Sequence, residues 1–266
     1  PPLYLVLFAA TTWFTGPSMA GGRAIAFAST IACGVLLALL VARGSRTSTA
    51  RPLAMAMAPL LFFSTWELGE WIAFARVDLP SIALGLAALV VALRGTSRSL
   101  AIAVFLCGLA FLTKPTQVFA PAAIVFALAW RRRWLEAFQF GFSLFLFNGM
   151  MIVAINGITA GEYSTHVIGY NNNAMHWNQV GSWAWHLWMF YSWRWIALVA
   201  ALALVAWTMW REQRGDVRDD ENNDAALDWP CATCYLALTA LSMVSVAKVG
   251  SAGNYLLEFQ AAAAWV

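Results

Sequence analysis

Basic residues in this chain concentrate in four short breaks between apolar runs, and these breaks recur at every second connection along the sequence. Eleven of the sixteen Lys and Arg residues fall in the breaks at 43–51, 94–98, 131–133 and 211–218. Cytoplasmic loops of membrane proteins carry an excess of Lys and Arg. The alternation therefore predicts a chain that crosses a membrane repeatedly, with all four breaks on the cytoplasmic side.

The composition excludes an ordinary soluble domain. Apolar residues make up 61% of the chain and charged residues only 11%, whereas soluble chains are roughly a quarter charged. The mean hydropathy is +0.67. We find no glycine-rich nucleotide fingerprint, and we read the net charge of +3 as topology rather than as a nucleic-acid surface. We expect an all-α, multi-pass bundle in the cytoplasmic membrane, forming a single domain over residues 1–266.

About eight membrane spans are predicted, several of them shorter than the roughly 20 residues that cross a bilayer core. A break at Lys114 and Pro115 is needed to bring the basic breaks at 94–98 and 131–133 to the same side. The predicted spans are Ala24–Val41, Leu53–Ala75, Leu79–Leu93, Leu100–Thr113, Thr116–Trp130, Ala137–Ile155, Trp195–Trp210 and Cys231–Ala247.

Two long connections differ sharply in composition. Residues 156–193 form a predicted outer loop rich in tryptophan that holds all three histidines, and it suits either an interfacial anchor or a contact with a lipid substrate. The histidines lie ten residues apart, a spacing that predicts no metal site. Residues 211–229 form a predicted cytoplasmic loop with seven of the thirteen acidic residues, which we interpret as solvated.

Most of the remaining acids and the isolated bases map to the outer side. Glu67 and Glu70 are three residues apart, which places them on one face of a helix end, and Arg76 and Asp78 lie in the turn that follows. These carboxylates could be general bases, metal ligands or partners of Arg76. The structural alternative is an ion pair with an Asp cap before Pro80.

Two further outer segments are candidates for ligand binding. Lys114, at the break between two short apolar runs, suits a lipid phosphate, although a lysine reaching to the membrane interface gives the same pattern. The segment 248–258 contains Lys248, Asn254, Tyr255 and Glu258 beside two glycines that permit close backbone approach. An ordinary turn between helices remains the alternative for this segment.

As a set, these motifs resemble the polyprenyl-phosphate-dependent GT-C glycosyltransferases, the superfamily of protein O-mannosyltransferases and aminoarabinose transferases. The resemblance is carried, in the same order, by Pro1-Pro2-Leu3-Tyr4, by Gly16-Pro17-Ser18 leading to Gly22-Arg23, by Arg76-Val77-Asp78-Leu79-Pro80, by Leu112-Thr113-Lys114-Pro115-Thr116 and by Gly250 to Glu258.

The resemblance implies an inverting enzyme that moves a sugar from a polyprenyl-phosphate carrier to a lipid, glycan or protein acceptor at the extracytoplasmic face. It implies that Asp78, with Glu67 and Glu70 as further candidates, serves catalysis. It also implies a substrate site formed by Tyr4, Arg23, Arg76, Lys114, Lys248, Asn254, Tyr255 and Glu258. No metal ligands are assigned, and a divalent metal ion stays open as a cofactor.

The family's principal catalytic Asp lies upstream of the segment that resembles Pro1 to Tyr4. We therefore expect the sequence to be an internal fragment, inactive by itself. The main alternative is a polytopic transporter or flippase of lipid-linked or small polar substrates. Ion-driven transporters usually bury charged residues near the membrane midplane, yet the predicted spans Ala24–Val41, Leu79–Leu93 and Cys231–Ala247 carry none.

Overall fold

The structure, a computed structural model, describes residues 2–44, 50–169, 173–178, 180–182, 184–185, 189, 203, 228–247, 254 and 256–266. Within these residues all regular structure is helical and no strand is present. The all-α prediction is therefore confirmed for the part of the chain that the structure describes. The predicted span Trp195–Trp210, apart from residue 203, and nearly all of the acidic loop 211–229 lie outside the described residues.

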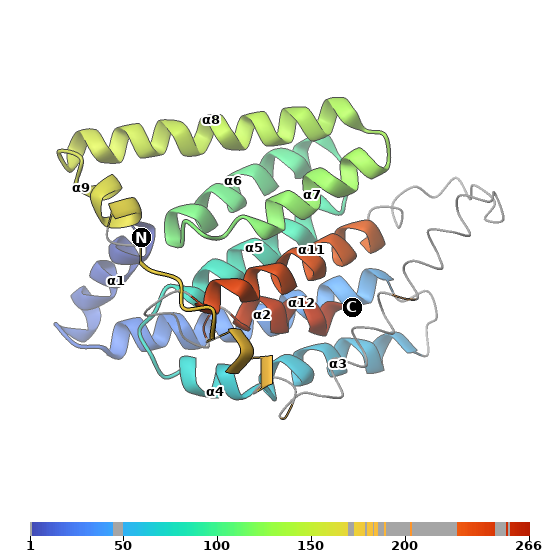
Figure 1. The fold of residues 1–266 in the computed structure, drawn as a ribbon, viewed down its shortest axis with the longest axis horizontal. Helices are drawn as coiled ribbons and strands as arrows, with labels where there is room; N and C mark the ends of the chain where they lie inside the picture. Colours follow the sequence, from blue (N-terminus) through green and yellow to red (C-terminus); the bar gives the residue numbers. More distant parts are fainter. Residues whose placement is uncertain are drawn as a thin grey trace.

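The helices form a bundle in which segments far apart in sequence pack together (Figure 1). The bounds, in chain order, are α1 (Pro2–Thr15), α2 (Ala20–Gly44), α3 (Ala50–Phe63), α4 (Trp66–Trp71), α5 (Asp78–Ala92), α6 (Ser97–Thr113), α7 (Phe119–Trp130), α8 (Trp134–Ile158), α9 (Glu162–Ser164), a π-helical turn (Thr165–Gly169), α11 (Asp228–Ser242), a 3-10 turn (Met243–Ala247) and α12 (Leu256–Trp265).

The core of the bundle lies around α5 and α12. Helix α5 packs against α2, α6 and α7, and it buries one apolar residue after another from Leu79 to Leu89. Helix α12 packs against α11, α3 and α2. Its run of alanines, residues 261–264, has small side chains that allow neighbouring helices to approach closely.

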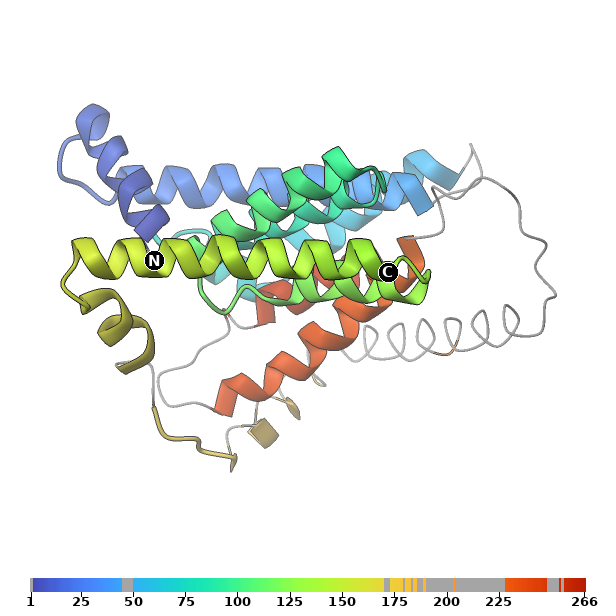
Figure 2. The ribbon, with the colours of Figure 1, turned by 90° about the horizontal axis from the view of Figure 1, so that it is seen from above.

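The outer surface of the bundle is unusually apolar. Helix α8, which lies along one side (Figures 1 and 2), buries only Ala137 and Phe140 and exposes Phe138, Phe145 and Val153 among others. Contiguous exposed apolar surface of this kind marks a membrane or an interaction partner. Two helices, α2 and α8, each 25 residues long, are long and apolar enough to cross a membrane, which agrees with a membrane protein.

The break in the chain before α7 occurs where the sequence predicts it. Helix α6 ends at Thr113, and Lys114 adopts an extended backbone with φ −147° and ψ 109°. Proline disfavours helical geometry in the residue before it, so Pro115 explains why the helix stops at this point. Pro121, in the first turn of α7, is tolerated because the first N–H groups of a helix have no intrahelical partner.

The prediction of one continuous span over Leu53–Ala75 is wrong. Helix α3 ends at Phe63, and α4 begins only after Ser64 and Thr65. The hydroxyls of these two residues donate to the carbonyls of Leu61 and Phe62, and Thr65 has an extended backbone. Short hydroxyl side chains compete with the helix for its backbone groups in this way. Part of the predicted outer loop 156–193 is also helical, because α8 continues to Ile158 and α9 follows.

The basic residues of three connections meet at one end of the bundle. Arg43 Nη2, at the end of α2, donates to the Leu93 carbonyl at 2.7 Å, and its Nε lies 3.6 Å from Asp228 at the start of α11. Arg133, before α8, donates to the Gly95 carbonyl at 2.6 Å. Where the structure describes them, the basic breaks therefore gather at one end, which we call the basic end.

Candidate functional site

Asp78, the first residue of α5, lies at the opposite end of the bundle from the basic end. Its carboxylate oxygen Oδ1 accepts hydrogen bonds from Lys114 Nζ and from Asn254 Nδ2, both at 2.8 Å. Its other oxygen, Oδ2, accepts from Arg76 Nε at 3.2 Å. The Asp78 side chain is only 2% exposed. We call these four residues (Asp78, Arg76, Lys114 and Asn254) the Asp78 cluster.

Helix ends explain how the cluster assembles. Asp78 begins α5, Lys114 follows the last residue of α6, and Asn254 lies just before α12. The antiparallel packing of α5 on α6 brings the start of one helix beside the end of the other. Three segments that are distant in sequence thus converge on one carboxylate.

Asp78 precedes the apolar part of α5, and the cluster keeps it ionised. Burial by itself would raise the pKa of its carboxyl group, because a charge is poorly solvated in the protein interior. The charge and hydrogen bond of Lys114, the hydrogen bond of Asn254 and the charge of Arg76 outweigh this effect and hold the pKa below its ordinary value. With two cations and one carboxylate, the cluster carries a formal charge of +1, which favours an anionic ligand.

The two cations differ in their surroundings. The Lys114 side chain is 17% exposed, whereas that of Arg76 is 47% exposed. The Arg76 guanidinium also lies over the ring of Trp71, with Cζ 4.4 Å from the ring centroid. A cation over an aromatic face is attracted by the ring quadrupole. Trp71 and Asp78 therefore fix the orientation of Arg76 from two sides.

A second polar group lies beside the Asp78 cluster. Glu258 Oε1, in the first turn of α12, accepts hydrogen bonds from the side-chain amide of Gln117 and from the Tyr235 hydroxyl, the latter at 3.1 Å. Sequence reasoning missed Gln117 and Tyr235. The one signal for Gln117 was its place three residues after Lys114 in the same short connection; Tyr235, inside an apolar helix, had none.

Tyr4 and Arg23 reach the same end of the bundle by different routes. The Tyr4 side chain is buried, and its hydroxyl has no hydrogen-bond partner among the described residues. A Cβ atom on Gly22 would lie 3.1 Å from this hydroxyl oxygen and 2.5 Å from the Ala75 side chain. Gly22 therefore lets α2 approach both α1 and the segment that leads to Asp78. Arg23 follows Gly22 and is exposed.

Glu67 and Glu70, predicted to share one face of a helix end, differ in their surroundings. Glu67 is buried, whereas Glu70 is exposed, so the two carboxylates of the short helix α4 do not share one face toward a site. Lys248 and Tyr255 lie outside the described residues. In the part of the chain that the structure describes, no three His, Cys, Asp or Glu side chains lie together as metal ligands would.

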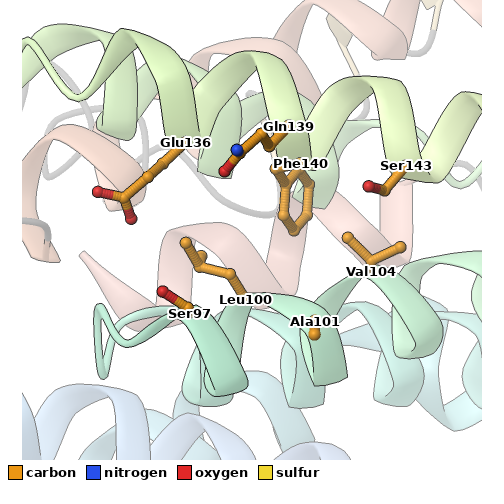
Figure 3. A pocket seen from close by; sticks show the side chains of 8 residues that line it. All are labelled: Ser97, Leu100, Ala101, Val104, Glu136, Gln139, Phe140 and Ser143. Carbon is orange, nitrogen blue, oxygen red and sulfur yellow. The ribbon is translucent and has the colours of Figure 1, made fainter.

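One sizeable cavity of the described residues lies away from the Asp78 cluster. It has a volume of about 460 Å³ and lies between α6 and α8, toward the basic end of the bundle (Figure 3). Its lining residues are Ser97, Leu100, Ala101, Val104, Glu136, Gln139, Phe140 and Ser143. Glu136 is paired with Arg133, and the residues that line the cavity include no Lys or Arg. Because it contains none of the predicted site residues, we regard the Asp78 cluster as the candidate site.

Comparison with known proteins gives one match. The model of glycosyltransferase family 87 matches residues 1–242, which is most of the chain. None of the curated proteins and none of the solved structures matches.

Proposed function

Because this chain belongs to glycosyltransferase family 87, we propose that it transfers a sugar from a polyprenyl-phosphate carrier to a lipid, glycan or protein acceptor. We place it as a multi-pass protein in the cytoplasmic membrane, with a GT-C-like bundle of about eight spans and its active face extracytoplasmic. The observation that carries the donor assignment is the buried Asp78 cluster, in which Lys114 and Arg76 converge at the end away from the basic residues.

The cations of the cluster suit the phosphate of the donor. Lys114 places its ammonium group beside Asp78, and lysine binds a phosphate as a point charge. Arg76 donates to Asp78 through Nε. The two terminal nitrogens of its guanidinium take no part in that bond and carry further N–H donors. We propose that both side chains bind the phosphate and stabilise the charge that it gains as the leaving group.

The transfer step is a displacement at the anomeric carbon. The acceptor oxygen forms a bond to that carbon while the bond to the phosphate oxygen breaks, so the configuration inverts. The acceptor's proton passes to a carboxylate, and the polyprenyl phosphate leaves with the bonding electrons. We assign Asp78 to the acceptor hydroxyl, Asn254 to holding the Asp78 carboxylate, and Tyr4 and Arg23 to the sugar or carrier. Lys248 and Tyr255 remain proposed substrate contacts.

The family and the apolar surface together favour a lipid-linked donor. Family 87 accounts for sugar transfer, and no nucleotide-binding fingerprint is present in the sequence. The exposed apolar side chains of α8 would face lipid, where a polyprenyl chain also dissolves. A carrier lipid could therefore present its phosphate at the end of the bundle without leaving the membrane.

The test is sugar transfer by the intact native protein in lipid nanodiscs, with polyprenyl-phosphate mannose as the donor and a membrane lipid extract as the acceptor. We expect labelled product with this donor and none with a sugar nucleotide. Lys114→Ala should raise the donor KM about tenfold, since a charge-assisted hydrogen bond contributes roughly 1.5–3 kcal/mol.

Arg94→Ala is the matched control, because Arg94 is an exposed cation at the basic end. It should leave the donor KM unchanged. Transfer from the sugar nucleotide alone would contradict the proposed donor, and equal donor KM values for Lys114→Ala and the native protein would contradict the phosphate site.

A further inference from the structure

The carboxylate of Glu258 is almost fully enclosed by the protein. The residue is 7% exposed, and one of its oxygens already accepts from both the Gln117 amide and the Tyr235 hydroxyl. A buried carboxylate is costly unless donors surround it. This carboxyl group therefore depends on its neighbours for hydrogen bonds, and its oxygen, which already accepts two of them, is a poor ligand for phosphate oxygens, which are acceptors too.

Glu258 joins the two segments that hold Asp78. Gln117, its partner, follows Lys114 in the connection between α6 and α7, and the Gln117 backbone N–H donates to the Lys114 carbonyl at 2.9 Å. On the other side, Glu258 lies four residues after Asn254 in the sequence, in the first turn of α12. Both Lys114 and Asn254 donate to the same Asp78 oxygen. These contacts, together with the short stretch of chain from Asn254 to Glu258, form a ring that runs through Asp78, Lys114, Gln117, Glu258 and Asn254.

The Gln117 side chain of this ring lies against a glycine of α5, Gly85. A Cβ atom on Gly85 would lie 3.3 Å from Gln117 Nε2 and 3.5 Å from the Ala120 side chain. Gly85 thus leaves room for the Gln117 amide to reach across α5 to α12. The Lys114 backbone N–H donates to the Ala110 carbonyl of α6 at 2.8 Å, and the Gln117 bond adds an anchor on the carbonyl side of Lys114, where Pro115 ends the helix.

We propose that Glu258 is a positioning residue, which holds Lys114 and Asn254 around Asp78 through its hydrogen bond to Gln117 and its place at the start of α12. This inference rests on the proposed function, in which Lys114 binds the donor phosphate. In this inference Glu258 positions other residues, whereas the sequence predicted that it contacts the substrate directly. Loss of the Glu258 carboxylate therefore affects donor binding only through Lys114.

The measurement is the Kd of farnesyl phosphate, a short analogue of the carrier, for the intact protein in nanodiscs, together with donor KM and kcat. Glu258→Leu and Gln117→Leu should each raise the Kd about fivefold to tenfold. Glu258→Gln keeps an oxygen that accepts from Gln117 and Tyr235, so its Kd should stay within about twofold of the native value. A comparable loss of kcat in Glu258→Gln and Glu258→Leu would overturn the inference, because it would mean that the negative charge itself takes part in the reaction.

A double-mutant cycle separates action through Lys114 from an independent contact. If Glu258 acts through Lys114, Glu258→Leu should change the Kd less than twofold when Lys114→Ala is already present. If the Kd of the double variant instead rises by the product of the two single-variant factors, the inference is overturned. If Lys114→Ala weakens binding and Glu258→Leu does not, the ring has no positioning role although the phosphate site stands. If Lys114→Ala leaves the Kd unchanged, the phosphate site and the inference both fail.

Two further variants guard against loss of folding. Gly85→Ala presses on the Gln117 amide from α5 without altering Glu258, and it should raise the Kd in the same direction. Thr30→Val removes a buried hydroxyl that bonds only within α2, to Ala26, so it serves as the control for a buried polar substitution. It should leave the Kd unchanged. A Gly85→Ala protein that melts normally and binds farnesyl phosphate normally would count against the ring.

Discussion

Lys114 Nζ and Asp78 Oδ1 lie 2.8 Å apart across the junction of α6 and α5, although 36 residues separate them in the chain. The pair is well shielded from solvent, since Asp78 is 2% exposed and Lys114 17% exposed. Removal of one partner from a buried ion pair leaves an uncompensated charge. The pair therefore gives the candidate site both its geometry and its sensitivity to substitution.

Asp78→Asn should reduce sugar transfer sharply. The amide cannot balance the charges of Lys114 and Arg76, and loss of a buried charged partner costs roughly 2–5 kcal/mol. We expect kcat/KM of the intact protein to fall at least 30-fold, measured with the lipid-linked donor. Near-normal turnover would make Asp78 a structural residue only.

Asp228→Asn is the control for this prediction. Asp228 also pairs with an arginine, Arg43, but at the basic end of the bundle. Its substitution should lower the melting temperature with little effect on the kcat of the folded protein. Equal losses of transfer in both variants would mean that the assay reports folding.

Arg76→Lys should be a poor replacement. Arginine bonds to Asp78 through Nε while its planar guanidinium lies over Trp71, and the compact ammonium of lysine cannot do both. We expect the donor KM to rise about threefold to tenfold in Arg76→Lys and further in Arg76→Ala. Trp71→Leu should produce a smaller increase, because it removes only the aromatic contact. A donor KM in Arg76→Ala equal to that of the native protein would remove Arg76 from the phosphate site.

Gly22→Ala should disturb the candidate site from a distance. The new methyl group would meet the Ala75 side chain at 2.5 Å, and that side chain has no freedom to turn aside. Helix α2 or the segment leading to Asp78 must shift, so both the melting temperature and transfer should fall. Gly149→Ala is the matched control, since nothing lies within 4 Å of its added Cβ. That control should be neutral or stabilised by up to about 1 kcal/mol, because alanine favours helix over glycine.

The proposed orientation can be tested with alkaline phosphatase fusions. A fusion after Asn172 should be active, because the preceding helix α8 leads away from the basic end toward the outer side. A fusion after Asn223, in the acidic loop, should be inactive. Activity in the second fusion but not in the first would reverse the proposed topology.

Sequence reasoning located the fold class and most helices because these depend on local patterns. Runs of apolar residues and the basic breaks predicted α2, α5, α6, α7 and α8 to within a few residues. The break at Lys114 followed from Pro115, which acts on its immediate neighbours. Helix α1 was not predicted, although its end at Gly16, with φ +67°, has a glycine signal.

The candidate site was predicted only as a set of residue types. The pattern placed Arg76, Asp78 and Lys114 on one side of the predicted membrane, but it could not show that one carboxylate binds both cations. It also placed Glu67 and Glu70 on one helix face but could not show that Glu67 is buried and Glu70 exposed, because three-residue spacing carries no information about how a short helix packs. Gln117 had only its nearness to Lys114 as a signal, and Tyr235, inside an apolar helix, had none.

By itself, the sequence determined that this chain forms apolar helices with its basic residues at alternating connections, because helix period and charge placement are properties of contiguous residues. Only the tertiary structure decided which helix ends meet. The ring from Asp78 through Lys114, Gln117, Glu258 and Asn254 joins residues up to 176 positions apart. Such contacts depend on the packing of α5 against α6 and of α12 into the bundle, and on small residues such as Gly85 that leave the space between them.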